Sequence, residues 1–127
     1  MEIKVKLDTI IIYVQNVDRL KSFYANVFNL RIVEEYESKW ALLDIGTSKI
    51  GLHKIGHKYL NASDDSFKFD NNTKIVFEIN EGINEVRRHF ISQNVVMREI
   101  KTFDNYDYWL CDGEDPEGNV FQLKQKK

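Results

Sequence analysis

An internal repeat of one strand-and-helix pattern constrains the fold of this chain more than any other feature. β-Branched residues from Ile10 to Val14 predict a strand, and apolar residues at steps of three and four from Val17 to Phe28 predict an amphipathic helix. Three more strands are predicted at residues 30–35, 40–45 and 49–54. The first half of the chain therefore has the order β-α-β-β-β.

The second half of the chain repeats this order. Val14 and Ile79 are 65 positions apart, and so are Leu30 and Val95. A second helix is predicted to begin at residues 80–82, and its apolar positions are Ile83, Val86, Phe90 and Ile91. Strands are predicted at residues 74–79, 95–100, 106–112 and 119–124. The two halves are thus two copies of one module.

Composition sets the boundaries of the two modules. Residues 56–72 are polar and rich in Asn, Asp and Ser, which is typical of a linker, with a short excursion at Phe67–Phe69. Module one then spans residues 1–55 and module two residues 73–127, within a single domain. A module of about 55 residues is only marginally stable alone. Sheets placed side by side would line a shared concave cavity, so the predicted fold class is α+β with two tandem βαβββ modules.

The segment from Asp115 to Leu123, DPEGNVFQL, fixes the geometry of the last strand. Gly118 or Asn119 can adopt the positive φ that a tight turn requires, and Asp115 can bond its own backbone two residues on. An alternating strand follows at once, so the turn presents Gln122 on one face of that strand. What Gln122 is presented to is the central question for function.

Charge and composition exclude several classes of function. The formal net charge of −2 argues against a nucleic-acid partner, which requires a basic surface. The longest apolar runs cover only a few residues, so no membrane span is predicted. The single Cys111 cannot form an internal disulfide, and it favours the reducing cytoplasm as the location and a half-buried strand position as its role.

The repeat and two motifs together resemble a known family. The opening segment from Ile10 to Tyr24, IIIYVQNVDRLKSFY, and the closing segment from Asp115 to Leu123 are similar to those of the vicinal oxygen chelate superfamily. That superfamily comprises glyoxalases, bleomycin-resistance proteins, extradiol dioxygenases and fosfomycin-resistance enzymes. The resemblance implies a homodimer. In members that bind a metal ion, it also implies His, Glu or Gln ligands from the first and last strands of each module.

Transferred to this chain, those ligand positions form a poor metal site. They are occupied by Thr9, His53, Lys74 and Gln122. A divalent catalytic ion needs about three nitrogen, sulfur or carboxylate ligands, and this set offers one imidazole. The ammonium group of Lys74 also repels a cation and has no lone pair. We therefore expect no metal and no other cofactor.

Strand alternation extends the central positions to a candidate ligand-binding set. Trp40 and Trp109 are 69 positions apart, as are His53 and Gln122, so the two tryptophans are interpreted as equivalent positions. Aromatic residues with a few polar groups suit a planar or partly anionic small molecule. Tryptophans in such positions are more often core or dimer-interface residues than ligand platforms, and a histidine such as His53 is more often a hydrogen-bonded strand residue than a catalyst. The ligand-binding set comprises Thr9, Ile11, Tyr13, Trp40, His53, Lys74, Val76, Glu78, Trp109 and Gln122.

Four acidic residues near the last turn allow two interpretations. Asp112, Glu114, Asp115 and Glu117 resemble an oxygen-ligand site for calcium, but their spacing lacks the regular loop of a calcium hand. The favoured interpretation is a solvated hairpin tip.

Three hypotheses about function remain open. The first is a metal-free protein that binds a small aromatic or antibiotic-like molecule, similar to the bleomycin-resistance branch. The second is an enzyme of lyase or dioxygenase type, metal-free or with a partial metal site, in which His53 is the catalytic general base and Lys74 or Gln122 steadies an oxyanion. The third is a structural or regulatory domain without a ligand. Binding is ranked first.

Overall fold

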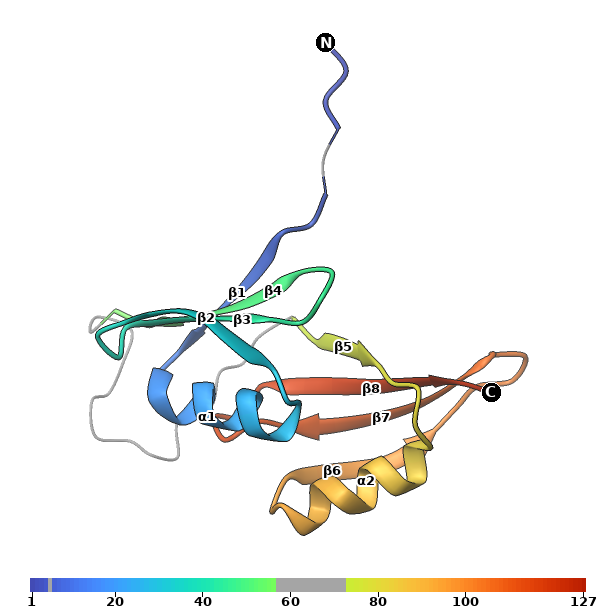
Figure 1. Ribbon diagram of the computed structural model, residues 1–127. Coiled ribbons are helices and arrows are strands. Elements are labelled where there is room, and N and C mark those ends of the chain that lie inside the picture. Colours follow the sequence, from blue (N-terminus) through green and yellow to red (C-terminus); the bar gives the residue numbers. More distant parts are fainter. Residues whose placement is uncertain (5, 57–72) are drawn as a thin grey trace. The chain divides into compact units, whose positions relative to one another are not determined.

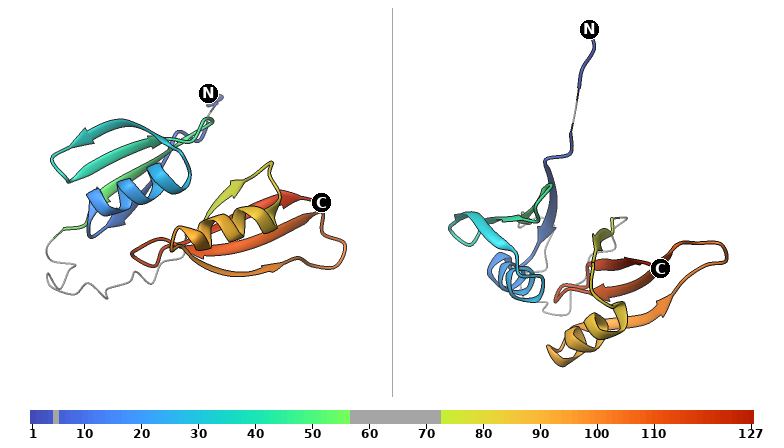
Figure 2. Two further views of the ribbon diagram at one scale, coloured as in Figure 1. Left: turned by 60° about the horizontal axis from the view of Figure 1, so that its bottom comes forward. Right: turned by 45° about the vertical axis from the view of Figure 1, so that its right-hand side comes forward.

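The computed structural model describes residues 1–4, 6–56 and 73–127, and it divides the chain into two compact units, Met1–Asp65 and Ser66–Lys127. Each unit contains a four-stranded sheet with one helix packed against one of its faces (Figures 1 and 2). The predicted excursion at Phe67–Phe69 lies outside the described residues. The α+β class and the two βαβββ modules are confirmed, and the cavity shared by the two sheets stays a prediction.

The first unit follows the predicted order of elements. They are β1 (Thr9–Val14), α1 (Val17–Val27), β2 (Arg31–Tyr36), β3 (Trp40–Asp44) and β4 (Lys49–Lys54). The strands lie in the order β1-β4-β3-β2. β1 runs parallel to β4, and the other pairs are antiparallel.

The second unit repeats this topology. Its elements are β5 (Ile75–Glu78), α2 (Ile83–Ser92), β6 (Val96–Lys101), β7 (Tyr108–Glu114) and β8 (Val120–Lys126). The strand order is β5-β8-β7-β6, with β5 parallel to β8. A bulge interrupts the pairing of β2 with β3 and, in the second unit, that of β6 with β7. The repeat in the sequence is therefore a repeat of register as well as of elements.

Local sequence signals account for the ends of the helices. The Asn16 side chain accepts a hydrogen bond of 3.0 Å from the backbone of Arg19, so Asn16 is the N-cap of α1. Asn29 and Asn94 follow the two helices with φ of 56° and 64°. Asparagine tolerates this left-handed conformation better than other residues with a side chain, so both helices end where their asparagines stand.

The N-terminus of α2 is capped from a distant strand. Gly82 precedes the helix and has no side chain to cap it. The side-chain oxygen of Gln125 on β8 accepts a hydrogen bond of 2.8 Å from the backbone of Ile83 instead. This bond satisfies one of the free N–H groups at the start of a helix and shows that Gln125 faces α2.

A separate hydrophobic core lies between each helix and its sheet. In the first unit Leu20 and Tyr24 of α1 are buried against the sheet, and in the second unit Phe90 of α2 packs on Phe121 of β8 with 6.3 Å between ring centroids. Each helix packs against one face of its own sheet, and buried residues alternate with more exposed ones along β1 and β8. Each sheet therefore has a helix-covered face and a second face, here called the helix-free face.

The turn from Asp115 to Asn119 is buried, and the prediction of a solvated hairpin tip is wrong. The Asp115 carboxylate accepts hydrogen bonds of 2.9 Å from the backbone of Glu117, from the backbone of Asn119 and from the side chain of Asn119. Gly118 supplies the positive φ, at 81°. These three hydrogen bonds compensate the Asp115 carboxylate for its lost hydration, so Asp115 can be buried. Glu117 is buried as well.

Neither helix of the described residues has the length and apolar character needed to cross a membrane.

Candidate functional site

The helix-free face of the first sheet presents a group of aromatic side chains. Tyr13 of β1 and Trp40 of β3 flank His53 of β4, because all three are paired across neighbouring strands. The ring centroids of Tyr13 and His53 are 5.2 Å apart, and those of Trp40 and His53 are 6.1 Å apart. Ile11 lies on the same face, and both Ile11 and Tyr13 are exposed. We call Ile11, Tyr13, Trp40, Gly51 and His53 the aromatic face.

Gly51 makes room for the indole ring of Trp40 on this face. A Cβ atom at position 51 would lie 2.5 Å from Cη2 of Trp40 and 3.2 Å from Cγ1 of Ile11. No side chain can be accommodated there without moving the indole. The indole N–H donates a 3.0 Å hydrogen bond to Glu34 on β2, which fixes the orientation of the ring. Trp40 is therefore held in place over Gly51.

A backbone hydrogen bond sets the tautomer of His53. Its Nδ1 lies 2.7 Å from the carbonyl oxygen of Lys54. Because a carbonyl oxygen only accepts, Nδ1 carries the proton in this contact, and Nε2 of the neutral ring is left as an acceptor. His53 is exposed, so that nitrogen can meet a ligand.

Thr9 is not part of the aromatic group. Its hydroxyl donates a hydrogen bond of 2.7 Å to Asp8, at the start of β1. Asp8 in turn pairs with Lys49, the first residue of β4, at 3.2 Å. Thr9 thus lies on the same helix-free face as Ile11 and Tyr13, but its hydroxyl makes a polar contact at the start of β1.

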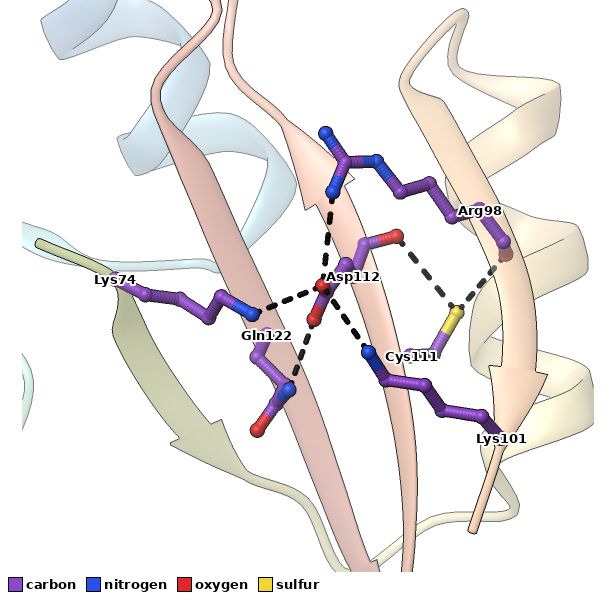
Figure 3. A network of polar contacts seen from close by, with 6 residues as sticks. All are labelled: Lys74, Arg98, Lys101, Cys111, Asp112 and Gln122. Carbon is purple, nitrogen blue, oxygen red and sulfur yellow. Dashed lines mark hydrogen bonds and ion pairs between the residues drawn. The ribbon is translucent and has the colours of Figure 1, made fainter. Parts of the chain in front are cut away.

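The helix-free face of the second sheet is organised around one buried carboxylate (Figure 3). Asp112 of β7 is only 5% exposed in its side chain. Its Oδ1 accepts a hydrogen bond of 2.9 Å from the Gln122 side chain, and its Oδ2 accepts one of 3.0 Å from Lys74. Arg98 and Lys101 of β6 each place a nitrogen 3.7 Å from the same Oδ2. We call Lys74, Arg98, Lys101, Asp112 and Gln122 the Asp112 cluster.

These contacts set the charge state of Asp112. Burial alone would raise the pKa of its carboxyl group. The hydrogen bonds from Gln122 and Lys74, together with the positive charges of Lys74 and Lys101, outweigh burial and hold the pKa below its ordinary value of 3.8. Asp112 is therefore ionised at neutral pH. The turn at residues 115–119 thus presents the Gln122 side chain to the Asp112 carboxylate.

Two further predicted residues of the second unit, Val76 and Glu78, also fall on its helix-free face. Val76 and Glu78 of β5 are exposed, and they pair with Gln122 and Lys124 in the parallel register. Lys124 lies over the ring of Tyr108, with its nitrogen 4.0 Å from the ring centroid. The cluster thus has an apolar and a cationic neighbour along β5 and β8.

The strand register corrects the predicted equivalence of His53 and Gln122. Ile11 pairs with Gly51, whereas Val76, which is 65 positions beyond Ile11, pairs with Gln122. Gly51 is therefore the counterpart of Gln122, and His53 is the counterpart of Lys124. The sequence-based alignment failed for two reasons. The hairpin loop of the second unit, residues 115–119, is one residue longer than the loop at residues 45–48. The segment between α1 and β3 also differs in length from the segment between α2 and β7.

Trp109 is likewise not the counterpart of Trp40. Asp44 and Glu114 flank the two hairpin loops and are 70 positions apart, so an offset of 69 misplaces Trp109 by one residue. A shift of one residue moves a side chain to the opposite face of its strand. Trp109 pairs with Gln125, which faces α2, and Lys127 covers its ring at 4.8 Å. Trp109 therefore lies on the helix-covered face, away from Gln122.

The donor set at the central positions does not fit a metal ion. Gly51 has no side chain, and Lys74 and Gln122 both donate hydrogen bonds to Asp112. Within residues 1–4, 6–56 and 73–127, no group of three or more His, Cys, Asp or Glu side chains is arranged to hold a metal. A divalent ion beside Asp112 would also be repelled by the three cationic side chains that surround this carboxylate.

Three members of the Asp112 cluster were not predicted as site residues. Arg98 and Lys101 come from β6, whose pairing with β7 contains the bulge between Met97 and Ile100. Within the bulge Arg98 turns toward Asp112, and its carbonyl oxygen accepts a 3.3 Å hydrogen bond from the thiol of Cys111. No pattern of single residues signals such a bulge. Asp112 itself was assigned to the hairpin tip.

Cys111 has a structural environment. It is fully buried on the helix-covered face, more deeply than the half-buried position that was predicted. Burial raises the pKa of its thiol, which keeps it protonated and unreactive at neutral pH.

The fold and the two modules define a class of protein, and comparison with known proteins identifies the family. The family model of the Glyoxalase/Bleomycin resistance protein/Dioxygenase superfamily matches residues 6–123. The chain belongs to this superfamily. A search of curated protein sequences gives no match.

Several solved structures have the same fold as this chain. A glyoxalase/bleomycin resistance protein/dioxygenase family enzyme from Burkholderia phytofirmans PsJN matches with a TM-score of 0.78 and 17% identity, over 97% of this chain and 100% of that chain. Lactoylglutathione lyase from Agrobacterium tumefaciens matches with a TM-score of 0.75 and 14% identity, over 96% and 94%. The genomically encoded fosfomycin resistance protein from Listeria monocytogenes gives 0.71 and 16%, over 100% and 96%. At these identities the likeness establishes the fold alone.

Proposed function

We propose that this chain is a small-molecule-binding protein of the superfamily that acts without a metal ion. Its ligand is a planar aromatic or antibiotic-like organic molecule, and its binding surface includes the aromatic face of the first unit. The observation that carries the proposal is the ring of Trp40, which is held over Gly51 by its hydrogen bond to Glu34 and lies beside His53, with Tyr13 on the other side of His53. A fixed indole beside exposed rings suits stacking with a planar ligand.

The chemistry of the central positions supports the metal-free part of this proposal. A metal-dependent member would need several ligands, and here Gly51 and Lys74 occupy two of the corresponding positions. A cytoplasmic location, which the single Cys111 favours, belongs to the same proposal.

Fluorescence of Trp40 tests the proposal directly. The variant Trp109→Phe leaves Trp40 as the single tryptophan, because the chain contains two. We expect a planar aromatic compound from a broad panel to change the emission of Trp40 in a saturable manner, in protein treated with a chelator. A panel in which no compound changes the emission or gives heat in calorimetry would leave the structural or regulatory hypothesis in its place.

Two variants then locate the bound compound. Tyr13→Ala removes an exposed ring of the aromatic face, and it should weaken binding by about tenfold. Phe103→Ala removes an equally exposed ring from the second unit and serves as the matched control, with unchanged affinity expected. Equal weakening in both variants would place the binding surface elsewhere.

A second candidate function is supported by the tautomer of His53. Its Nε2 is an acceptor on an exposed face beside Tyr13 and Trp40, as a general base requires. In an enzyme of the superfamily without a metal, His53 would take a proton from the bound substrate. Once a binding compound is found, its turnover by the wild type but not by His53→Ala would favour this function, whereas binding without turnover favours the first.

A further inference from the structure

We infer that the helix-free face of the second unit contains a binding site for a doubly charged oxyanion, such as a phosphate monoester. The site consists of Lys74, Arg98 and Lys101, and Asp112 positions their charged groups. These residues belong to the second unit and those of the aromatic face to the first, and the inference does not depend on the proposed function.

The first step is the charge balance around Asp112. One carboxylate is surrounded by three cationic side chains, so the cluster retains two positive charges. The local charge of the cluster is opposite in sign to the net charge of residues 73–127, which contain eight Lys and Arg and ten Asp and Glu. Neutralising Asp112 requires one cation, so the other two are available to a ligand.

The second step is the position of the three cations. Their side chains are 40%, 53% and 48% exposed for Lys74, Arg98 and Lys101, whereas that of Asp112 is 5% exposed. The carboxylate thus lies beneath the three charged groups, which converge from β6 and the start of β5 (Figure 3). A buried anion that gathers cations and leaves them half exposed presents their positive charge to solvent.

The third step is the other charged groups on this face. Glu78 pairs in register with Lys124, and Lys124 lies over Tyr108. Glu114 is two residues beyond Asp112, next to the hairpin turn. Glu99, the acidic residue of β6, pairs with Arg87 on the helix-covered side at 3.4 Å.

The fourth step is the class of ligand. A phosphate monoester carries a charge between about −1.5 and −2 at neutral pH, which matches the excess of the cluster. Its three terminal oxygens can each accept from a separate side chain, and Arg98 can donate two parallel hydrogen bonds. A carboxylate has half this charge and two oxygens, so it should bind more weakly.

Binding of phenyl phosphate to the full-length protein tests the site. Amide chemical shifts in a nitrogen–proton correlation spectrum would be followed during titrations with phenyl phosphate, benzoate and benzyl alcohol. We expect saturable shifts around Asp112 and Gln122 with phenyl phosphate, weaker ones with benzoate and none there with benzyl alcohol. The affinity should fall as sodium chloride is added, because the site is half exposed.

Charge variants separate this site from unspecific attraction. Arg98→Gln and Lys101→Gln should each weaken phenyl phosphate binding by about tenfold. Arg88→Gln makes the same change in net charge on α2, where Arg88 pairs with Glu85, and it should leave the affinity unchanged. The side chains of Arg88, Arg98 and Lys101 are each about half exposed or more, so their replacement should leave the fold intact. The correlation spectrum of each variant shows whether it is folded.

Three results would overturn the inference. They are the absence of saturable shifts with phenyl phosphate, equal affinities for phenyl phosphate and benzyl alcohol, and equal weakening in Arg88→Gln and Arg98→Gln. The proposed function is judged separately by the emission of Trp40. Failure of one site therefore does not imply failure of the other.

Discussion

Asp112 is the residue whose surroundings most affect both the stability and the chemistry of the second unit. It is a buried carboxylate with a hydrogen bond to each oxygen and two further cations at 3.7 Å. A buried charge is tolerated only when such partners compensate the loss of hydration. The same partners leave positive charge at the surface, so the structural role of Asp112 and the inferred anion site are linked.

The variant Asp112→Asn should reduce stability in a pH-dependent manner. The folded pKa of Asp112 lies below 3.8, so ionised Asp112 stabilises the fold above that pH, and this contribution is lost as pH falls through the folded pKa. We expect the variant to lose about 2 kcal/mol of unfolding free energy at neutral pH. The difference should shrink in acid below the ordinary pKa. Urea unfolding followed by circular dichroism measures both, with the exposed Asp104→Asn as control. Equal midpoints at neutral pH would contradict the role given to Asp112.

Gly51 is the second decisive residue, because it sets the position of Trp40. In Gly51→Ala the new Cβ would meet the indole at 2.5 Å, so the ring must move. We expect a shift in the emission of Trp40 in the Trp109→Phe background and a cost of about 1–3 kcal/mol in unfolding free energy. Unchanged emission would mean that the indole does not lie over Gly51. Gly46→Ala, at a position with open space around it but a φ of 102°, controls for backbone strain.

Among the secondary-structure elements, β8 depends most on the turn from Asp115 to Asn119, which directs this strand back along β7. The Asp115 side chain satisfies two backbone N–H groups and one side-chain amide, all within the turn. Gln122 and Phe121 follow directly, one on each face of the strand.

Asp115→Ala should therefore destabilise the second unit strongly. The backbone donors of Glu117 and Asn119 would be left buried without this partner, at a cost of about 3 kcal/mol in unfolding free energy. The loss should appear in the midpoint of urea unfolding. Asp107→Ala, which removes an exposed aspartate elsewhere in the unit, should change the midpoint little. A similar small change in Asp115→Ala would show that the turn forms without its side chain.

How far the sequence predicts this protein also depends on scale. The elements follow from local signals, such as the β-branched run in β1, the N-cap at Asn16 and the asparagine that ends each helix. Register does not, because an alignment that is wrong by one residue assigns a side chain to the opposite face of its strand. For this reason Trp109 was paired with Trp40 and is found on the helix-covered face. The Asp112 cluster depends on a β-bulge at Arg98, so it could not be predicted from the sequence either.

At the scale of the whole molecule, each sheet has one face without a helix, and that face exposes apolar residues. Ile11 and Tyr13 in the first unit and Val76 and Val96 in the second are examples. Exposed apolar residues of this kind favour burial on association. A homodimer, which family resemblance implies, remains our proposal for the quaternary state.

Light scattering coupled to size-exclusion chromatography tests this proposal. We expect a mass of about 30 kDa, twice the 15.0 kDa of one chain, which is the dimer that the family resemblance implies. The dimer should persist in high salt, as apolar contacts are not screened by ions. A mass of one chain at all concentrations would contradict it.

The central claim is that the aromatic face binds an organic ligand without a metal ion. Its most direct measurement is a map of amide chemical shifts for the tightest-binding panel compound, in chelator-treated protein with wild-type sequence. We expect saturable shifts centred on Tyr13, Gly51 and His53, unchanged when zinc, nickel or manganese is added. Shifts centred on other residues, or binding that appears only after a metal ion is supplied, would contradict it.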